Sequence, residues 1–173
     1  MKTVVKTCSL AILIMLGFSI TASAQAGRKA DKDTKTWRYE IEGVGIGIQG
    51  TYLVKVWSYS KKPDVALDQA KKNAVHGIVF KGFSGRPGMP GQRALANNPF
   101  VEQERADFFK KFFADRGPYM KFVYESGDGS VAAEDRMKVA KEYKIGVIVS
   151  VNVAALRQYL EDEGVIKGLA SGF

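Results

Sequence analysis

Three patterns in the 173-residue sequence predict a single α+β domain, with an antiparallel or mixed sheet of four to five strands packed against two to three helices. Apolar and polar residues alternate at 37–42 and 51–59, which is typical of strands with one buried face. Small apolar residues recur at helical spacing after Pro63. A valine-rich stretch at 143–151 keeps one parity and predicts a central strand. The predicted order of elements is β-β-α-loop-α-β-β-α.

The first 24 residues have the pattern of a cleavable signal peptide. Two lysines precede the apolar run 10–18, and Ala-Ser-Ala at 22–24 supplies the small residues of a cleavage site. The run is shorter than the ~20 apolar residues that a membrane-spanning helix needs, so we expect no integral membrane anchor. The protein is therefore predicted to be exported, either to the periplasm or to the extracellular medium.

Residues 25–35 are polar and lack apolar periodicity, which predicts a flexible leader ahead of a single domain at 36–173. Cleavage would remove Cys8, the one cysteine, and leave no disulfide or thiolate chemistry. It would also remove two lysines, so the net charge would fall from +8 to +6. This basic balance favours an acidic envelope protein, an anionic glycan or a cell-wall polymer as partner, and nucleic acid is not expected in the envelope.

The first two strands are expected to form a β-hairpin. Trp37, Tyr39 and Ile41 alternate with charged residues, and a second strand should follow at 51–59. Glycines interleave with apolar residues across 43–50, which predicts a twisted, bulged strand with a turn at its end. A glycine-rich nucleotide loop would lead into a helix, whereas a strand follows here, so the pattern excludes nucleotide binding.

The first helix should begin at Pro63 and run to about His76, with a stripe of mostly small apolar residues facing the sheet. A loop rich in glycine and proline then occupies 82–98 and carries Arg86 and Arg93. Loops of this length are uncommon in compact domains unless they are functional or disordered. We therefore treat this loop as a candidate binding element.

A second helix should start at Asn98-Pro99, and its four phenylalanines within 108–113 predict an aromatic stripe that faces the core. A third strand is expected at 120–124, where Met, Phe and Tyr alternate with other residues. A turn at 127–129 should close this strand, because Gly-Asp-Gly is a strong turn sequence.

Apolar residues of one parity from Met137 to Val151 predict one long strand, or two strands joined by a bend near Lys141-Glu142. Asn152 should cap a last helix, which would run from Val153 to about Glu163 and end at a glycine.

Few residues could carry catalysis. His76 is the only histidine, and its place on a helix favours a structural role. Glu102, Glu104 and Asp107 lie on the first turns of one helix, where a pair of acids could act in a small glycan or cell-wall hydrolase. Acids at that position also favour the helix dipole, so their presence has a purely structural explanation. We expect neither a metal site nor a cofactor.

A binding surface is predicted on the second strand. Lys55, Trp57 and Tyr59 share one face, and exposed aromatics beside a lysine can stack on a sugar ring or a partner side chain. Together with Arg86 and Arg93 they form the predicted binding site. This favours a non-catalytic binding or assembly module of the cell envelope, with the hydrolase as the alternative and a homo-oligomer as a third possibility.

The strand at 51–59 leading into an alanine-spaced helix resembles the small α+β domains of bacterial envelope proteins, such as the N-terminal domain of flagellar assembly protein T and related small lipoproteins. This resemblance covers about 51–82 and includes no catalytic or ligand-binding residue that could be carried over to this chain. It implies a non-enzymatic role in the envelope. The chain as a whole also resembles uncharacterised secreted proteins of Gram-negative anaerobes.

Overall fold

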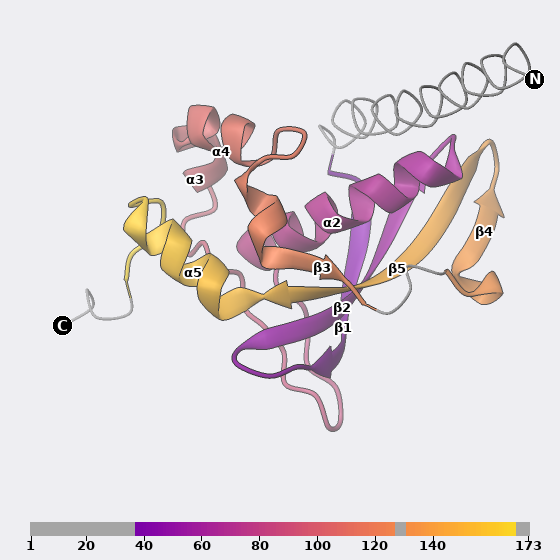
Figure 1. Cartoon of the computed structure of the whole chain (residues 1–173), viewed down its shortest axis with the longest axis horizontal. Helices are drawn as coiled ribbons and strands as arrows, with labels where there is room; N and C mark the ends of the chain where they lie inside the picture. The colour runs from indigo at the N-terminus through magenta and orange to yellow at the C-terminus, as the bar shows by residue number, and fades with distance from the viewer. Residues whose placement is uncertain (1–36, 127–130, 169–173) are drawn as a thin grey trace, which may run out of the picture.

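The computed structural model of the protein describes residues 37–126 and 131–168 (Figure 1). The predicted signal peptide, the leader and the turn predicted at 127–129 lie outside these residues. Within the described ranges, no helix combines the length and the apolar character that crossing a bilayer requires.

The described part of the chain forms one antiparallel sheet of five strands, which confirms the predicted α+β class. The order is β1-β2-β5-β3, and β4 also pairs with β5. β5 is the central strand, because it pairs with β2 along one edge while β3 and β4 occupy the two ends of its other edge. The strands are β1 (Tyr39–Ile46), β2 (Thr51–Ser60), β3 (Val123–Glu125), β4 (Arg136–Val139) and β5 (Glu142–Asn152).

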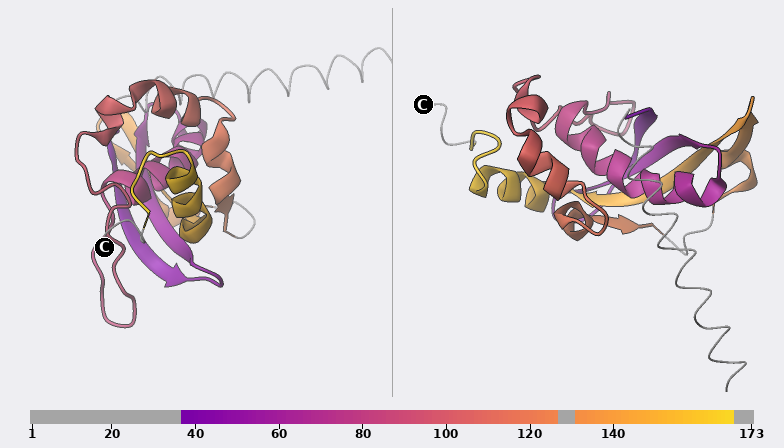
Figure 2. Two further views of the ribbon diagram at one scale, coloured as in Figure 1. Left: turned by 90° about the vertical axis from the view of Figure 1, so that its left-hand side faces the viewer. Right: turned by 90° about the horizontal axis from the view of Figure 1, so that it is seen from above.

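The long helix α2 packs across one face of this sheet, against β2 and β5 (Figures 1 and 2). The remaining helices gather near the C-terminal end of α2 and of β5. The helices are α2 (Pro63–Phe80), α3 (Val101–Glu104), α4 (Ala106–Phe112) and α5 (Val153–Asp162), with 3-10 turns at Pro118–Phe122 and Ala133–Asp135. Asn152 caps α5 as predicted, since its side-chain oxygen accepts a hydrogen bond from Ala155 N at 2.9 Å.

The core lies between α2 and the sheet. Ala66, Ala70 and Ala74 are fully buried, and their small side chains let α2 approach the strands closely. Valines of the two central strands complete this layer: Val54, Val56, Val149 and Val151. The predicted aromatic stripe forms a second part of the core, in which rings of α4 contact Phe122 and Tyr159.

Three predicted elements differ in extent from the observed ones. α2 continues to Phe80, four residues beyond the prediction, and its last turn buries Ile78 and Val79 in the core. The second helix is divided into α3 and α4 at Arg105, whose backbone leaves the helical range. The strand predicted at 120–124 is wrong for its first half: Pro118–Phe122 is a 3-10 turn that buries Tyr119 and Phe122, three residues apart.

The stretch from Met137 to Val151 forms two strands joined by a tight turn, which confirms one of the two predicted alternatives. Ala140 in this turn has φ of 54°. Because the chain turns back between β4 and β5, odd-numbered residues of β4 pair with even-numbered residues of β5. Met137 is paired with Lys144, so both side chains lie on the same face of the sheet. The shared parity therefore does not put these residues on one face: Met137 and Val139 of β4 are exposed on the face opposite the buried valines of β5.

Candidate functional site

The face of the sheet opposite α2, here called the open face, is covered by no α-helix within the described ranges (Figure 2). On β2, Val54 and Val56 point toward α2, and the alternating residues Lys55, Trp57 and Tyr59 point to the open face. These three side chains are partly exposed. The structure therefore brings together three of the five predicted binding residues.

Trp57 lies near the middle of the open face. The register places it between Glu40 on β1 and Gly146 on β5. The amines of Lys55 and Lys144 lie 5.0 Å and 5.1 Å from the centre of its ring, which is within the range of a cation–π contact. Its indole nitrogen also donates a hydrogen bond of 3.3 Å to Glu42. The indole is thus held by cations while part of it stays accessible.

Tyr59 anchors a neighbouring group of charges. Its hydroxyl donates to Glu40 at 2.5 Å, and Lys144 donates to both oxygens of the same carboxylate at 2.9 Å. The hydrogen bond from Tyr59, followed by that from Lys144, lowers the pKa of Glu40. Arg38 lies 4.6 Å from the Tyr59 ring and also forms an ion pair with Glu142.

Charges on the open face are nearly balanced. Lys55 forms an ion pair of 2.6 Å with Asp135, which reaches the face from the turn before β4. With the charges around Tyr59 included, the open face carries three basic and four acidic side chains. The basic ones are Arg38, Lys55 and Lys144, and the acidic ones are Glu40, Glu42, Asp135 and Glu142. The face therefore does not attract anions strongly, although the whole chain is basic.

Exposed apolar side chains also gather on the open face. The strand register places four such residues there. Ile148 of β5 is paired with Lys55, and Tyr124 of β3 is paired with Ser150. On β4, Met137 is paired with Lys144 and Val139 with Glu142. Half of the large exposed apolar residues of the described chain are in this set: Tyr124, Met137, Val139 and Ile148. Sequence reasoning missed them, because three of the four come from short strands whose pairing the alternation pattern alone does not define.

Arg86 and Arg93 belong to a different surface. The loop that carries them folds into a narrow hairpin, with bridges between Phe83 and Gln92 and between Arg86 and Met89. Phe83 and Met89 pack beside Gly43 of β1, on the face of the sheet that α2 covers. Both arginines are exposed, but the structure does not bring them to the open face.

His76 lies in a buried polar cluster between α2, β1 and α3. The Tyr39 hydroxyl lies 2.6 Å from Nδ1, and a Glu102 carboxylate oxygen lies 3.2 Å from Nε2. Because a carboxylate can only accept, Nε2 carries the proton and Nδ1 accepts from Tyr39. The Trp37 ring stacks on the imidazole at 3.6 Å and donates to the same Glu102 oxygen at 2.9 Å. Burial lowers the pKa of His76, although Glu102 partly opposes this effect.

The three acids proposed for hydrolysis have separate surroundings. Glu102 is engaged by His76 and Trp37, and the hydrogen bond from His76 lowers its pKa. Glu104 accepts a hydrogen bond of 2.8 Å from Asn98, and Asp107 is exposed on α4. A general acid needs a raised pKa, so Glu102 is poorly suited to that role.

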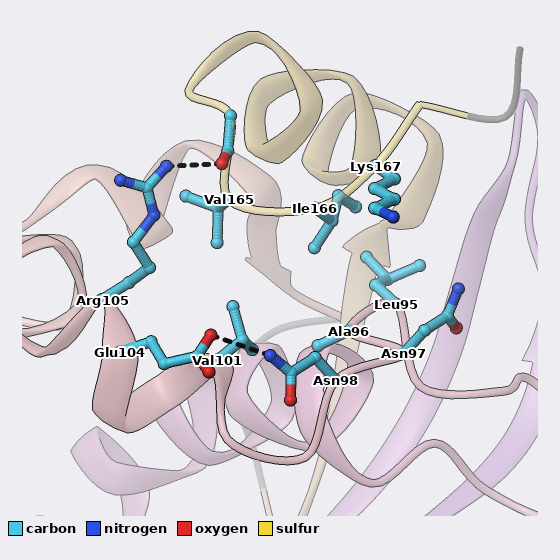
Figure 3. A pocket seen from close by; sticks show the side chains of 11 residues that line it. Leu95, Ala96, Asn97, Asn98, Val101, Glu104, Arg105, Val165, Ile166 and Lys167 are labelled. Carbon is cyan, nitrogen blue, oxygen red and sulfur yellow. Dashed lines mark hydrogen bonds between the residues drawn. The ribbon is translucent and has the colours of Figure 1, made fainter. Parts of the chain in front are cut away.

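A pocket with a volume of about 610 Å³ lies between α3, the loop before it and the segment after α5 (Figure 3). Its floor is apolar, with Leu95, Val101, Val165 and Ile166 directed toward one another. Arg105 at its rim donates to the carbonyl of Gly164. This bond ties the end of α5 to α3, so the polar rim has a structural role. Sequence reasoning missed this pocket, because its walls come from segments about 60 residues apart.

In the described ranges no three histidine, cysteine or acidic side chains come close enough together to hold a metal ion. Comparison of the chain with protein-family models, with curated proteins and with solved structures finds no match. The functional interpretation therefore rests on the geometry of the sheet and its loops.

Proposed function

We propose that the protein is an exported, non-catalytic binding module of the cell envelope, and that it binds a partner protein through the open face of its sheet. The observation that carries this proposal is the composition of that face. Trp57 and Tyr59 lie among paired charges, and four exposed apolar side chains lie on the neighbouring strands β3, β4 and β5. A sheet face that combines aromatic rings with several large exposed apolar side chains has the composition of a protein interface.

A protein partner fits this face better than an anionic polymer does. The basic side chains are already matched by acids, most closely Lys144 by Glu40 and Lys55 by Asp135. A polyanion would have to displace these acids, and little net attraction would remain. Tryptophan, tyrosine, methionine and arginine are the residue types that protein interfaces favour, and this face holds all four.

Export is inferred from the signal-peptide pattern of residues 1–24. The hydrolase alternative gains no support from the acids of α3 and α4, because Glu102 and Glu104 are bound to different partners. A second copy of the chain is a partner that the same experiment can detect.

The test begins with capture of partners from envelope extract by the tagged chain from residue 25 onward. Each captured protein is then purified, and its affinity is measured directly. Trp57→Ala, and separately Met137→Ser with Val139→Ser, should weaken the true partner about tenfold or more, because buried aromatic anchors dominate interface energies.

Phe100→Ser is the matched control, since Phe100 is also a large exposed side chain but precedes α3 on the helical side. Equal affinity of this variant and the native chain supports the open face. A partner whose affinity is unchanged by all the open-face variants would contradict the proposal.

A further inference from the structure

Two hairpins project from the same end of the molecule. One is the turn between β1 and β2, at residues 46–50, and the other is the narrow hairpin of the loop at 83–92. In Figure 1 and in the left view of Figure 2, both extend downward beyond the rest of the domain. We call this region the hairpin end. It is separate from the open face.

The loop hairpin packs against β1 through residues at its base and at its turn. Phe83 and Met89 pack so closely on Gly43 that a Cβ atom there would lie 2.4 Å from Met89 Cε and 2.5 Å from Phe83 Cε2. The Phe83 ring also meets the Tyr52 ring edge-on at 5.9 Å. These contacts fix the loop hairpin against β1 and β2, and both tips point to the same end of the molecule (Figure 2).

The first tip is apolar and held outward. Ile48 is 82% exposed and Ile46 is 54% exposed. The turn that carries them is well formed, with a hydrogen bond of 2.8 Å from Gly47 N to Thr51 O. Gly50 supports it with φ of 74°, a value that suits glycine. The exposure of both isoleucines is therefore a property of an ordered turn.

The second hairpin is basic, with one arginine at its tip and one at its base. Arg86 begins the turn of the loop hairpin, where hydrogen bonds of 2.9 Å and 2.8 Å join it to Met89. Arg93 lies at the hairpin's base, and both arginines are exposed. No acidic residue occurs in 43–63 or in 69–101, so neither hairpin contains a charge that could neutralise them. This contrasts with the open face, where acids match the basic side chains.

We propose that the hairpin end docks onto a membrane surface containing anionic phospholipid. Exposed isoleucines beside unmatched arginines are the combination that an anionic bilayer surface binds: apolar side chains enter the interface while guanidinium groups pair with phosphate. The two hairpins carry basic residues and no acidic ones, so their charge is complementary to that of an anionic membrane surface. Docking would leave the open face free for its partner, so the two surfaces act independently.

The experiment is sedimentation of the purified chain from residue 25 onward with phosphatidylcholine vesicles, with and without phosphatidylglycerol. Removal of residues 1–24 is necessary, since a signal peptide would itself bind lipid. The native chain should bind the anionic vesicles and not the neutral ones. Arg86→Gln with Arg93→Gln should weaken binding about 10- to 30-fold, as two lost basic residues imply. Ile46→Ser with Ile48→Ser should weaken it about tenfold.

Lys110→Gln with Lys111→Gln is the matched control, because it removes the same charge from exposed positions on α4. Phe100→Ser controls for loss of an exposed apolar side chain. Both should bind as the native chain does. The proposal is overturned if the native chain ignores anionic vesicles, if the lysine control weakens binding as much as the arginine pair does, or if the isoleucine variant binds normally.

Discussion

The indole of Trp57 lies directly over Gly146 on the neighbouring strand. A Cβ atom at Gly146 would lie 2.8 Å from Cζ3 of the indole, closer than nonbonded carbons approach. Glycine at this position therefore lets the ring lie along the sheet between the amines of Lys55 and Lys144. The centre of the open face depends on this one missing side chain.

Gly146→Ala should displace the Trp57 ring. The added methyl group forces the ring away from the strand, and its fluorescence should move toward that of a solvated indole. The measurement is made in a Trp37→Phe background, where Trp57 is the only tryptophan, with excitation that is selective for indole. The free energy of unfolding should change by less than about 1 kcal/mol, because the ring can move and alanine suits a strand better than glycine. An unchanged emission spectrum would show that the ring does not lie over Gly146.

Tyr39→Phe should lower the free energy of unfolding by about 1–3 kcal/mol, because it leaves Nδ1 of the buried His76 without a donor. Tyr124→Phe is the matched control: its hydroxyl donates to the carbonyl of Lys121 on the exposed surface. That variant should stay within about 0.5 kcal/mol of the native chain in urea unfolding. Equal losses in the two variants would argue against a special contribution from the cluster.

Stability should fall as the pH is lowered below about 6.5, the ordinary pKa of a histidine in an unfolded chain. Burial lowers the pKa of His76 in the folded state. Between the two pKa values the unfolded chain binds a proton that the folded chain does not, so acidification favours unfolding. Glu102, whose pKa is also lowered, titrates below this window.

Urea unfolding at a series of pH values measures this effect, with His76→Gln as the reference. His76 is the only histidine, so the variant should lose the pH dependence between about 5.5 and 7. If His76→Gln keeps the same pH dependence of the free energy of unfolding, groups other than His76 are responsible for it.

Ala140→Gly should raise the free energy of unfolding by about 0.5–1 kcal/mol. Ala140 has φ of 54° in the turn between β4 and β5, where a side chain is disfavoured and glycine is not. Thermal unfolding of the two chains gives the comparison. Ala154→Gly, on the helix α5, should have the opposite effect, because glycine weakens a helix. Destabilisation by Ala140→Gly would contradict the turn geometry.

The strongly periodic elements could be predicted from the sequence. β1, β2, α2 and α5 have a clear period of two residues or of helical turns, and their starts carry recognisable signals such as Pro63 and Asn152. The fold class follows from these elements. The segment at Pro118–Phe122 could not be predicted in this way. Its apolar residues fit the alternation of a strand, but they also fit a 3-10 turn, in which residues three apart are buried on one side.

The candidate site could be predicted only in part. Lys55, Trp57 and Tyr59 share a face because a strand alternates, and that relation is visible in the sequence. The sequence could not show that Arg86 and Arg93 lie on a different surface from these three residues. The position of their loop depends on the contacts of Phe83 and Met89 with β1. The acids that match the basic side chains also come from strand register, which single-sequence patterns leave open.

The open face as a partner-binding surface is tested most directly by a photo-crosslinking amino acid placed at Ile148, near the middle of that face. The same group at Phe100 serves as the comparison, and both positions are exposed in the isolated chain. In cells that export the protein, we expect one dominant covalent adduct from position 148 and none of that size from position 100. Absence of any adduct at position 148, or the same adduct from both positions, would show that the open face does not bind a partner.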